Sequence, residues 1–122
     1  MEKLVFFVDD DKMILNLLEY TLNNRPGYTI KTFDSGVDCL SNMFLKPDVI
    51  VLDYIFKGQK MTGLDILKEI RNNDKDIPVI ILTSQDDNDV KDEFQRFGAN
   101  YFIPKNDFFV DALMEKIDAE IQ

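Results

Sequence analysis

Short apolar runs alternate along the chain with segments in which apolar residues recur every three or four positions. The runs predict β-strands and the periodic segments predict α-helices. Five strands are expected, at 4–8, 28–33, 49–52, 79–82 and 101–103. Five helices are expected, at about 14–22, 35–45, 62–73, 90–97 and 109–121. Because nearly continuous apolar strands are separated by helices, we expect an α/β fold with a doubly wound parallel sheet covered on both faces.

Local signals support this reading of the elements. The strand 28–33 alternates between apolar and polar residues, as an edge strand does. Ser35 and Asp38 resemble a capping box at the start of the second helix. The fourth helix has few apolar residues, and Gly98 is expected to end it.

The composition is that of one ordinary globular domain. The chain has 122 residues, of which 45% are hydrophobic and 30% are charged. No linker or repeat interrupts the pattern, so residues 1–122 are expected to form a single domain with no output domain. No apolar run approaches the roughly 20 residues of a membrane span, and no signal-peptide pattern opens the chain. We therefore expect a cytoplasmic protein without a membrane partner.

Charge and two absences restrict the chemistry. The net charge of −9, from 14 basic and 23 acidic residues, argues against direct binding to nucleic acid. The absence of histidine excludes Ser-His-Asp triads, Cys-His dyads and histidine-ligated metals. The single cysteine, Cys39, excludes an internal disulfide and is expected to be a packing residue. Carboxylates, hydroxyls, lysines and the backbone remain for polar chemistry.

Polar residues follow four of the expected strands at their carboxyl ends. They are Asp9, Asp10, Asp53, Thr83, Ser84 and Lys105. Taken singly, each has a structural explanation, such as helix capping for an aspartate or solvation for the lysine. Ligands of open parallel sheets bind at this edge, however, and independent structural causes do not explain so many functional groups there. The joint placement favours a site.

The residue types suggest phosphoryl chemistry on a carboxylate. Three carboxylates in close proximity repel one another, so the site needs a cation. An all-oxygen set without histidine or cysteine suits Mg2+ rather than zinc. Asp53 can attack phosphorus to give an acyl phosphate, while Thr83 donates to one phosphoryl oxygen and Lys105 pairs with another.

These residues resemble the receiver domains of response regulators in two-component signalling, in their stand-alone form. The resemblance spans the chain and rests on Val8-Asp9-Asp10, Val51-Leu52-Asp53, Leu82-Thr83-Ser84 and the segment 98–105. It implies a flavodoxin-like (βα)5 fold with strand order 2-1-3-4-5. It also implies a chain that is not an enzyme but a phosphoacceptor, which assists its own phosphorylation and dephosphorylation.

The resemblance assigns a role to each site residue. Asp53 is similar to the phosphoacceptor, Asp10 to a direct Mg2+ ligand and Asp9 to a ligand that acts through water, while the backbone carbonyl of Ile55 completes the metal set. The phosphate-binding and switch residues are Thr83, Ser84, Lys105 and Phe102. The implied donor is the phosphohistidine of a sensor histidine kinase or a histidine phosphotransfer protein. The implied output is a conformational change on the face of the fourth helix, fifth strand and last helix, toward an unknown protein target, in a monomer or weak dimer.

Three departures from the family pattern carry expectations of their own. The loop 56–63 lacks the usual proline and is two residues longer. A kinase or phosphatase would dock there, so we expect this loop to determine partner specificity. Asn106 stands where a proline usually follows the lysine, so we expect a trans Lys105–Asn106 bond. Asn100 and Tyr101 are not acidic, which argues against a dimer held by charged pairs there. The apolar Ile55 and nearby Gln85 further suggest slow self-dephosphorylation.

Other functions fit less well. A phosphatase of the haloacid-dehalogenase type needs a second aspartate two residues after the nucleophile, where Ile55 stands. A flavin binder needs a Ser/Thr/Gly-rich phosphate loop after the first strand, where the chain has three consecutive aspartates, 9–11. A pseudo-receiver, which keeps the fold and binds proteins without phosphorylation, remains the open alternative.

Overall fold

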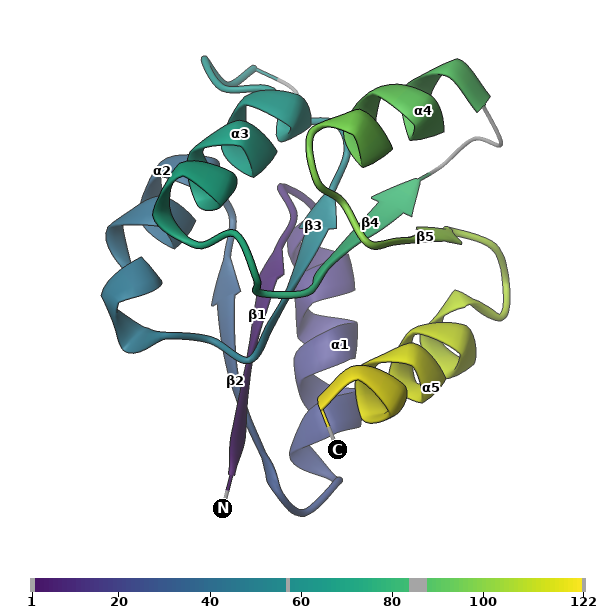
Figure 1. The fold of residues 1–122 in the computed structure, drawn as a ribbon. Helices are drawn as coiled ribbons and strands as arrows, with labels where there is room; N and C mark the ends of the chain where they lie inside the picture. The colour runs from purple at the N-terminus through teal and green to yellow at the C-terminus, as the bar shows by residue number, and fades with distance from the viewer. Residues whose placement is uncertain (1, 57, 84–87, 122) are drawn as a thin grey trace.

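The computed structural model describes residues 2–56, 58–83 and 88–121, in which strands and helices alternate as the hydrophobic pattern predicts (Figure 1). The strands are β1 (Lys3–Val8), β2 (Tyr28–Phe33), β3 (Val49–Asp53), β4 (Val79–Thr83) and β5 (Tyr101–Pro104). The helices are α1 (Lys12–Asn23), α2 (Gly36–Ser41), the 3-10 helix η1 (Met43–Leu45), α3 (Gly63–Asn73), α4 (Asn88–Arg96) and α5 (Phe109–Ile121).

All five strands are parallel and lie in the order β2-β1-β3-β4-β5. This is the predicted flavodoxin-like order, in which the chain reverses its direction of travel across the sheet between β1 and β3. The register pairs Val8 with Leu52, Asp53 with Leu82, and Thr83 with Pro104. The carboxyl ends of β1, β3, β4 and β5 therefore meet at one edge, beside the reversal.

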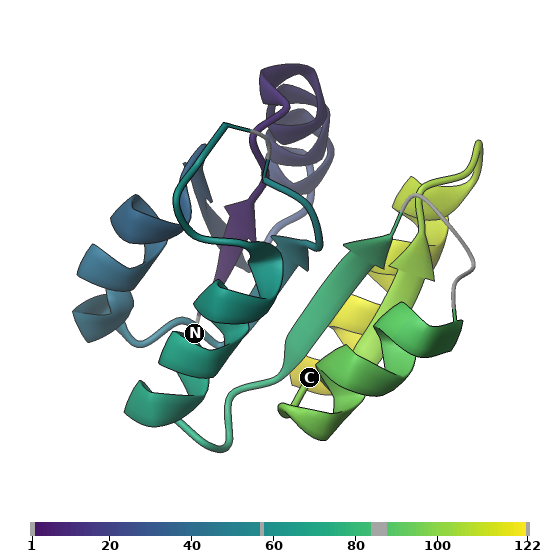
Figure 2. The same ribbon diagram turned by 90° about the horizontal axis from the view of Figure 1, so that it is seen from above.

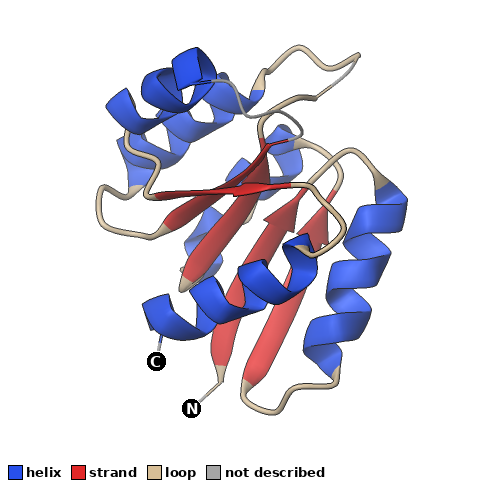
Figure 3. Ribbon diagram, turned by 90° about the vertical axis from the view of Figure 1, so that its right-hand side faces the viewer, coloured by secondary structure: helices blue, strands red, loops and turns tan. Residues whose placement is uncertain are grey.

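Helices cover both faces of the sheet, α1 and α5 on one side and α2, α3 and α4 on the other (Figures 2 and 3). Every residue of β3 and β4 is buried, and successive side chains alternate between the two layers. Val49 and Val51 pack toward α1 and α5, whereas Ile50 and Leu52 pack toward α2 and α3. The central strands are thereby held from both sides, while β2 alternates in burial as an edge strand should.

The second helix differs from its predicted bounds. Ser35 does cap its start, because the side chain accepts a hydrogen bond from the Asp38 N–H at 3.1 Å. The helix ends at Ser41, though, and η1 replaces the expected continuation to residue 45. The side chain of Asn42 donates to the Asp38 carbonyl at 2.7 Å, and Lys46 takes a left-handed φ of 55°. These two features accompany the change from the α-helix to the tighter 3-10 helix before Pro47.

Two further expectations concern Cys39 and membrane spans. Cys39 is fully buried against α3, and burial raises the pKa of its thiol to about 12, so it is a packing residue as predicted. Within the described ranges, none of the helices has the length and apolar character required to cross a bilayer.

Candidate functional site

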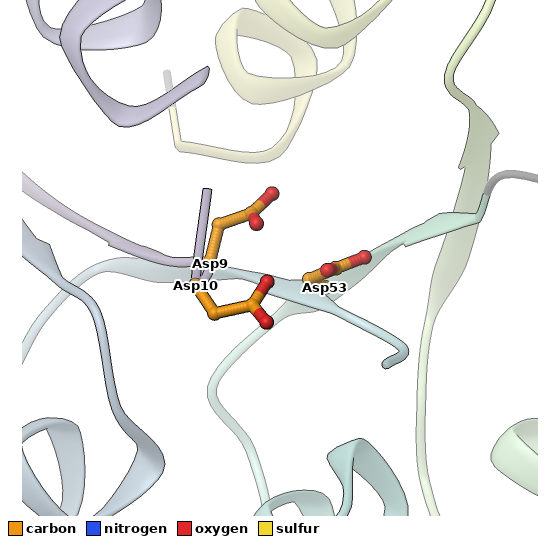
Figure 4. A group of neighbouring side chains, drawn as sticks. All are labelled: Asp9, Asp10 and Asp53. Atoms are coloured by element: carbon orange, nitrogen blue, oxygen red, sulfur yellow. The ribbon is translucent and has the colours of Figure 1, made fainter. Parts of the chain in front are cut away.

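Three carboxylates meet where β1 and β3 end. Asp53 is the last residue of β3, and Asp9 follows β1, which pairs directly with β3. Both are buried, with 5% and 1% of their surface exposed, and Asp10 beside them is half-buried. Carboxylate oxygens of all three lie within 4.8 Å of one another (Figure 4). The β-sheet therefore holds together the acidic residues that the sequence analysis grouped.

Asp11 belongs to the helix rather than to this cluster. Its side chain accepts a hydrogen bond from the Met13 N–H at 2.9 Å and so caps α1. Asp9 instead accepts the Asp11 N–H at 2.9 Å through Oδ1, and its second oxygen accepts a hydrogen bond from Lys105. Helix capping thus explains Asp11 without explaining the buried Asp9.

Lys105 reaches the cluster from the end of β5. Its Nζ lies 2.9 Å from Oδ2 of Asp9 and 3.2 Å from Oδ1 of Asp53. Its backbone N–H donates to the Thr83 carbonyl at 2.6 Å, which places the lysine beside β4. Burial works against the ammonium charge, but the hydrogen bond to Asp9 and the two carboxylate charges outweigh it, so the pKa of Lys105 is raised. In this structure the lysine therefore offsets part of the negative charge of Asp9 and Asp53.

One lysine does not fully compensate the buried acidic groups. Burial, followed by the charge of Asp9, raises the pKa of Asp53 to about 7. Lys105 and the Tyr54 N–H, which donates to Asp53 Oδ1 at 2.9 Å, oppose this shift. A divalent cation would remove the remaining cost of ionising Asp53. The donors are carboxylate oxygens, and neither histidine nor a cysteine thiolate is within the cluster, which fits Mg2+.

The hydroxyl of Thr83 is buried. The residue is 1% exposed, and its Oγ1 makes no hydrogen bond to any residue that the structure describes. A buried unsatisfied hydroxyl costs about 1–3 kcal/mol, so its retention at the end of β4 calls for an explanation. An oxygen-rich group bound next to Asp53 on the neighbouring strand would accept the hydrogen bond that the fold leaves unmade. Ser84, the other predicted phosphate-binding residue, lies outside the described residues.

The remaining predicted residues surround this centre. Ile55 lies two residues beyond Asp53 with its side chain 40% exposed, at the start of the loop to α3. Phe102 of β5 is half-buried against the core cluster that includes Phe94 of α4. Phe102 therefore lies on the face of the sheet that α4 covers, where a rearrangement of that helix would change its surroundings.

The peptide bond between Lys105 and Asn106 is trans, as expected, since none of the described peptide bonds is cis. The sequence analysis did not foresee what Asn106 does instead of proline. Its side-chain oxygen accepts the Phe108 N–H at 2.9 Å and its carbonyl accepts the Phe109 N–H at 3.2 Å. Asn106 thus forms the turn that leads into α5. The preference of asparagine for such turns was the available signal.

The loop after Asp53 makes a contact that was also not predicted. The side-chain amide of Gln59 donates to the Asp34 carbonyl at 2.9 Å, which ties this loop to the one after β2. Asp34 in turn lies 4.0 Å from the ammonium group of Lys12 on the solvent-exposed surface. The loop after Asp53 therefore contacts the chain just after β2.

Comparisons with known proteins agree with this fold. The family model described as the response regulator receiver domain matches residues 5–118. The alkaline phosphatase synthesis transcriptional regulatory protein PhoP of Bacillus subtilis is 33% identical over 106 residues, which cover 86% of this chain and 43% of that protein. The DNA-binding transcriptional regulator NtrC of Escherichia coli is 37% identical over 103 residues, covering 84% of this chain and 21% of NtrC.

Among solved structures, the chemotaxis protein CheY4 of Vibrio cholerae superposes with a TM-score of 0.87 at 26% identity, over 98% of this chain and 99% of that one. This chain spans less than half the length of the two curated relatives named above.

Proposed function

The chain belongs to the response regulator receiver domain family, and from this premise we propose that it accepts a phosphoryl group on Asp53. The donor is the phosphohistidine of a sensor histidine kinase or of a histidine phosphotransfer protein. The observation that carries the proposal is the arrangement at the sheet edge, where Asp53 is buried between two aspartates and a lysine, next to the unsatisfied Thr83 hydroxyl.

The transfer is a displacement at phosphorus. A carboxylate oxygen of Asp53 forms a bond to phosphorus while the phosphorus–nitrogen bond of the donor breaks, and the electron pair of that bond stays on the histidine nitrogen. The Thr83 hydroxyl donates to one phosphoryl oxygen. Lys105 leaves its carboxylate partners to pair with another. These two contacts stabilise the charge that the phosphoryl group carries during transfer.

Mg2+ would be held by Asp10, Asp53 and the Ile55 carbonyl, with Asp9 acting through a water molecule. When bound, it supplies charge neutralisation between the acidic residues and the phosphoryl oxygens. The chain's own part is to hold its carboxylates close together and largely out of water, which the burial of Asp9 and Asp53 achieves.

The signal leaves through the surface formed by α4, β5 and α5. Among the described residues of α4, Phe94 alone is buried, so this helix is weakly anchored and suited to shift between states. Movement of Thr83 toward the phosphoryl group and inward rotation of Phe102 would change this surface. The chain then acts as a cytoplasmic signalling protein rather than an enzyme, and its target is a protein rather than a nucleic acid, consistent with its charge of −9.

The test is phosphorylation by a small-molecule donor. The protein is incubated with Mg2+ and acetyl phosphate, and its intact mass is measured before and after. We expect the addition of one phosphoryl group, abolished by EDTA and absent in Asp53→Asn. A wild-type protein that gains no mass under these conditions would instead be a pseudo-receiver that binds its partner without phosphorylation.

A further inference from the structure

The backbone that follows Asp53 is pressed against the first residue of α3. A Cβ atom on Gly63 would lie 2.5 Å from the Tyr54 carbonyl oxygen and 2.9 Å from the Asp53 carbonyl oxygen. Both are backbone atoms, so they cannot rotate aside as a flexible side chain would. Only glycine permits α3 to begin this close to the end of β3.

The start of α3 is itself fixed. The Thr62 hydroxyl accepts the Asp65 N–H at 3.1 Å, and the Asp65 carboxylate accepts the Thr62 N–H at 3.0 Å. This reciprocal capping box defines where the helix begins. The capping box therefore fixes the position of Gly63 next to the Tyr54 backbone. This position does not depend on the path of the loop that connects Tyr54 to Thr62.

Both neighbours of Ile55 are anchored. On one side, the Tyr54 N–H donates to the Leu82 carbonyl at 3.2 Å while its own carbonyl faces Gly63. On the other side, Phe56 is only 7% exposed and packs in the core cluster between the sheet and α3. Ile55 itself is 40% exposed. Its backbone is thus held by its two neighbours.

We propose that Gly63 is a positioning residue, whose contact with the Asp53–Tyr54 backbone directs the Ile55 carbonyl into the Mg2+ site. This inference rests on the proposed function, because it concerns the same metal. It also accounts for a loop that lacks the usual proline. In this proposal the anchored residues Tyr54 and Phe56 orient the Ile55 carbonyl between them. The lengthened part of the loop is then not needed for this purpose and can make other contacts, such as that of Gln59 with Asp34.

The test compares two alanine substitutions that each add a Cβ at a close contact involving α3. Gly63→Ala meets the backbone after Asp53, whereas a Cβ on Gly36 would lie 2.3 Å from side-chain atoms of Ile66, elsewhere on α3. The Mg2+ dissociation constant is measured by calorimetric titration, and the free energy of unfolding by urea in EDTA. We expect both variants to lose stability, and Gly63→Ala alone to weaken Mg2+ binding, by about 10- to 100-fold.

Two results would contradict the positioning role of Gly63, and a third would contradict the proposed function. Unchanged Mg2+ affinity in Gly63→Ala, or equal weakening in Gly36→Ala, overturns the positioning role. A wild-type protein that does not bind Mg2+ counts against the proposed function instead, and so separates the two failures.

If Gly63→Ala does not fold, Phe56→Leu loosens the other anchor, and Phe94→Leu, at the buried position of α4, is its matched control. We expect weaker Mg2+ binding in Phe56→Leu only, and equal affinity in these two variants would overturn the proposal.

Discussion

At the scale of single residues, burial of Asp53 makes its charge costly. Its pKa is about 7 in the folded protein against 3.8 for an ordinary aspartate. Such a group destabilises the fold increasingly as pH rises from about 4 to about 7, because the unfolded chain gives up its proton first. Above pH 7 the cost is fully present. Below pH 4 both states are protonated and the cost vanishes.

Asp53→Asn removes this cost, so in metal-free buffer it is expected to unfold at higher urea than the wild type. The difference should grow between pH 4 and 7, reach roughly 2–4 kcal/mol, and stay constant above. Urea unfolding across this pH range in EDTA measures it. Asp34→Asn, at an exposed aspartate, is the control and should show no such trend. An Asp53→Asn advantage that is the same at pH 4 and pH 8 would contradict the buried-charge explanation.

Ile55 offers a second test at this scale, which depends on the proposed phosphorylation. Its side chain, two residues after the acceptor and 40% exposed, is apolar and cannot hydrogen-bond to an attacking water molecule. We expect Ile55→Asn to speed the loss of the phosphoryl group by about tenfold, equivalent to about 1.4 kcal/mol in the barrier. The decay of the phosphorylated mass after removal of the donor measures the rate. Ile55→Val keeps an apolar side chain and should decay like the wild type; an unchanged rate in Ile55→Asn would reject the idea.

The site could be predicted from sequence as far as position along strands determines it. Asp9, Asp53 and Thr83 stand at strand ends, and parallel strands bring their carboxyl ends together. What Lys105 contacts could not be predicted, because side-chain pairing depends on distances across the sheet. The orphaned Thr83 hydroxyl was likewise hidden, since whether a polar atom has a partner is a property of the packed structure.

At the scale of elements, α3 holds the end of α4 through two cationic side chains. The ammonium group of Lys68 lies 4.4 Å from the centre of the Phe97 ring. Arg71 donates to the Gly98 carbonyl from two nitrogens, at 3.0 and 2.7 Å, and to the Asn100 side chain at 2.9 Å. Gly98 has a left-handed φ of 105°, so its carbonyl turns toward the arginine. These contacts hold the segment that follows α4, whereas the helix itself buries only Phe94 among its described residues.

Arg71→Met keeps much of the side-chain length but removes every one of these hydrogen bonds, leaving the Gly98 carbonyl without its donors. We expect a loss of about 1–3 kcal/mol in the free energy of unfolding. Arg96→Met, at an exposed arginine of α4, is the matched control and should stay within about 0.5 kcal/mol of wild type. Urea unfolding of the wild type, Arg71→Met and Arg96→Met measures these free energies. Equal stability of the two variants would show that the hydrogen bonds of Arg71 do not contribute to the stability of the fold.

Hydrophobic periodicity predicted each described β-strand and α-helix, because a strand or helix that packs against the core shows its own spacing of apolar residues. The error at α2 shows its limit. Leu40, Met43 and Phe44 fit a helical period, yet the backbone tightens into η1 after Ser41. The hydrogen bond from Asn42 back to Asp38 competes with the regular helix there, and periodicity does not register such local competition.

At the scale of the whole molecule, the charge of −9 and the acidic site both make the fold sensitive to cations, by mechanisms that can be separated. General screening acts on all exposed charges and depends on ionic strength alone. Binding at the site adds about 2.7 kcal/mol to the free energy of unfolding when free Mg2+ reaches 100 times its dissociation constant. Since Asp53 must lose its proton to bind the metal, this gain should shrink as pH falls below about 7.

We therefore expect Mg2+ to stabilise the wild type at pH 8 well beyond NaCl of the same ionic strength, and Asp10→Asn to respond to the two salts alike. Asp10 is chosen because Asp53→Asn also removes the buried charge and so changes stability without metal. Thermal unfolding in each salt, at pH 8 and pH 5.5, supplies the comparison. If Asp10→Asn kept the full Mg2+ effect, the stabilisation would come from screening of the acidic surface, and the three carboxylates would not form the metal site.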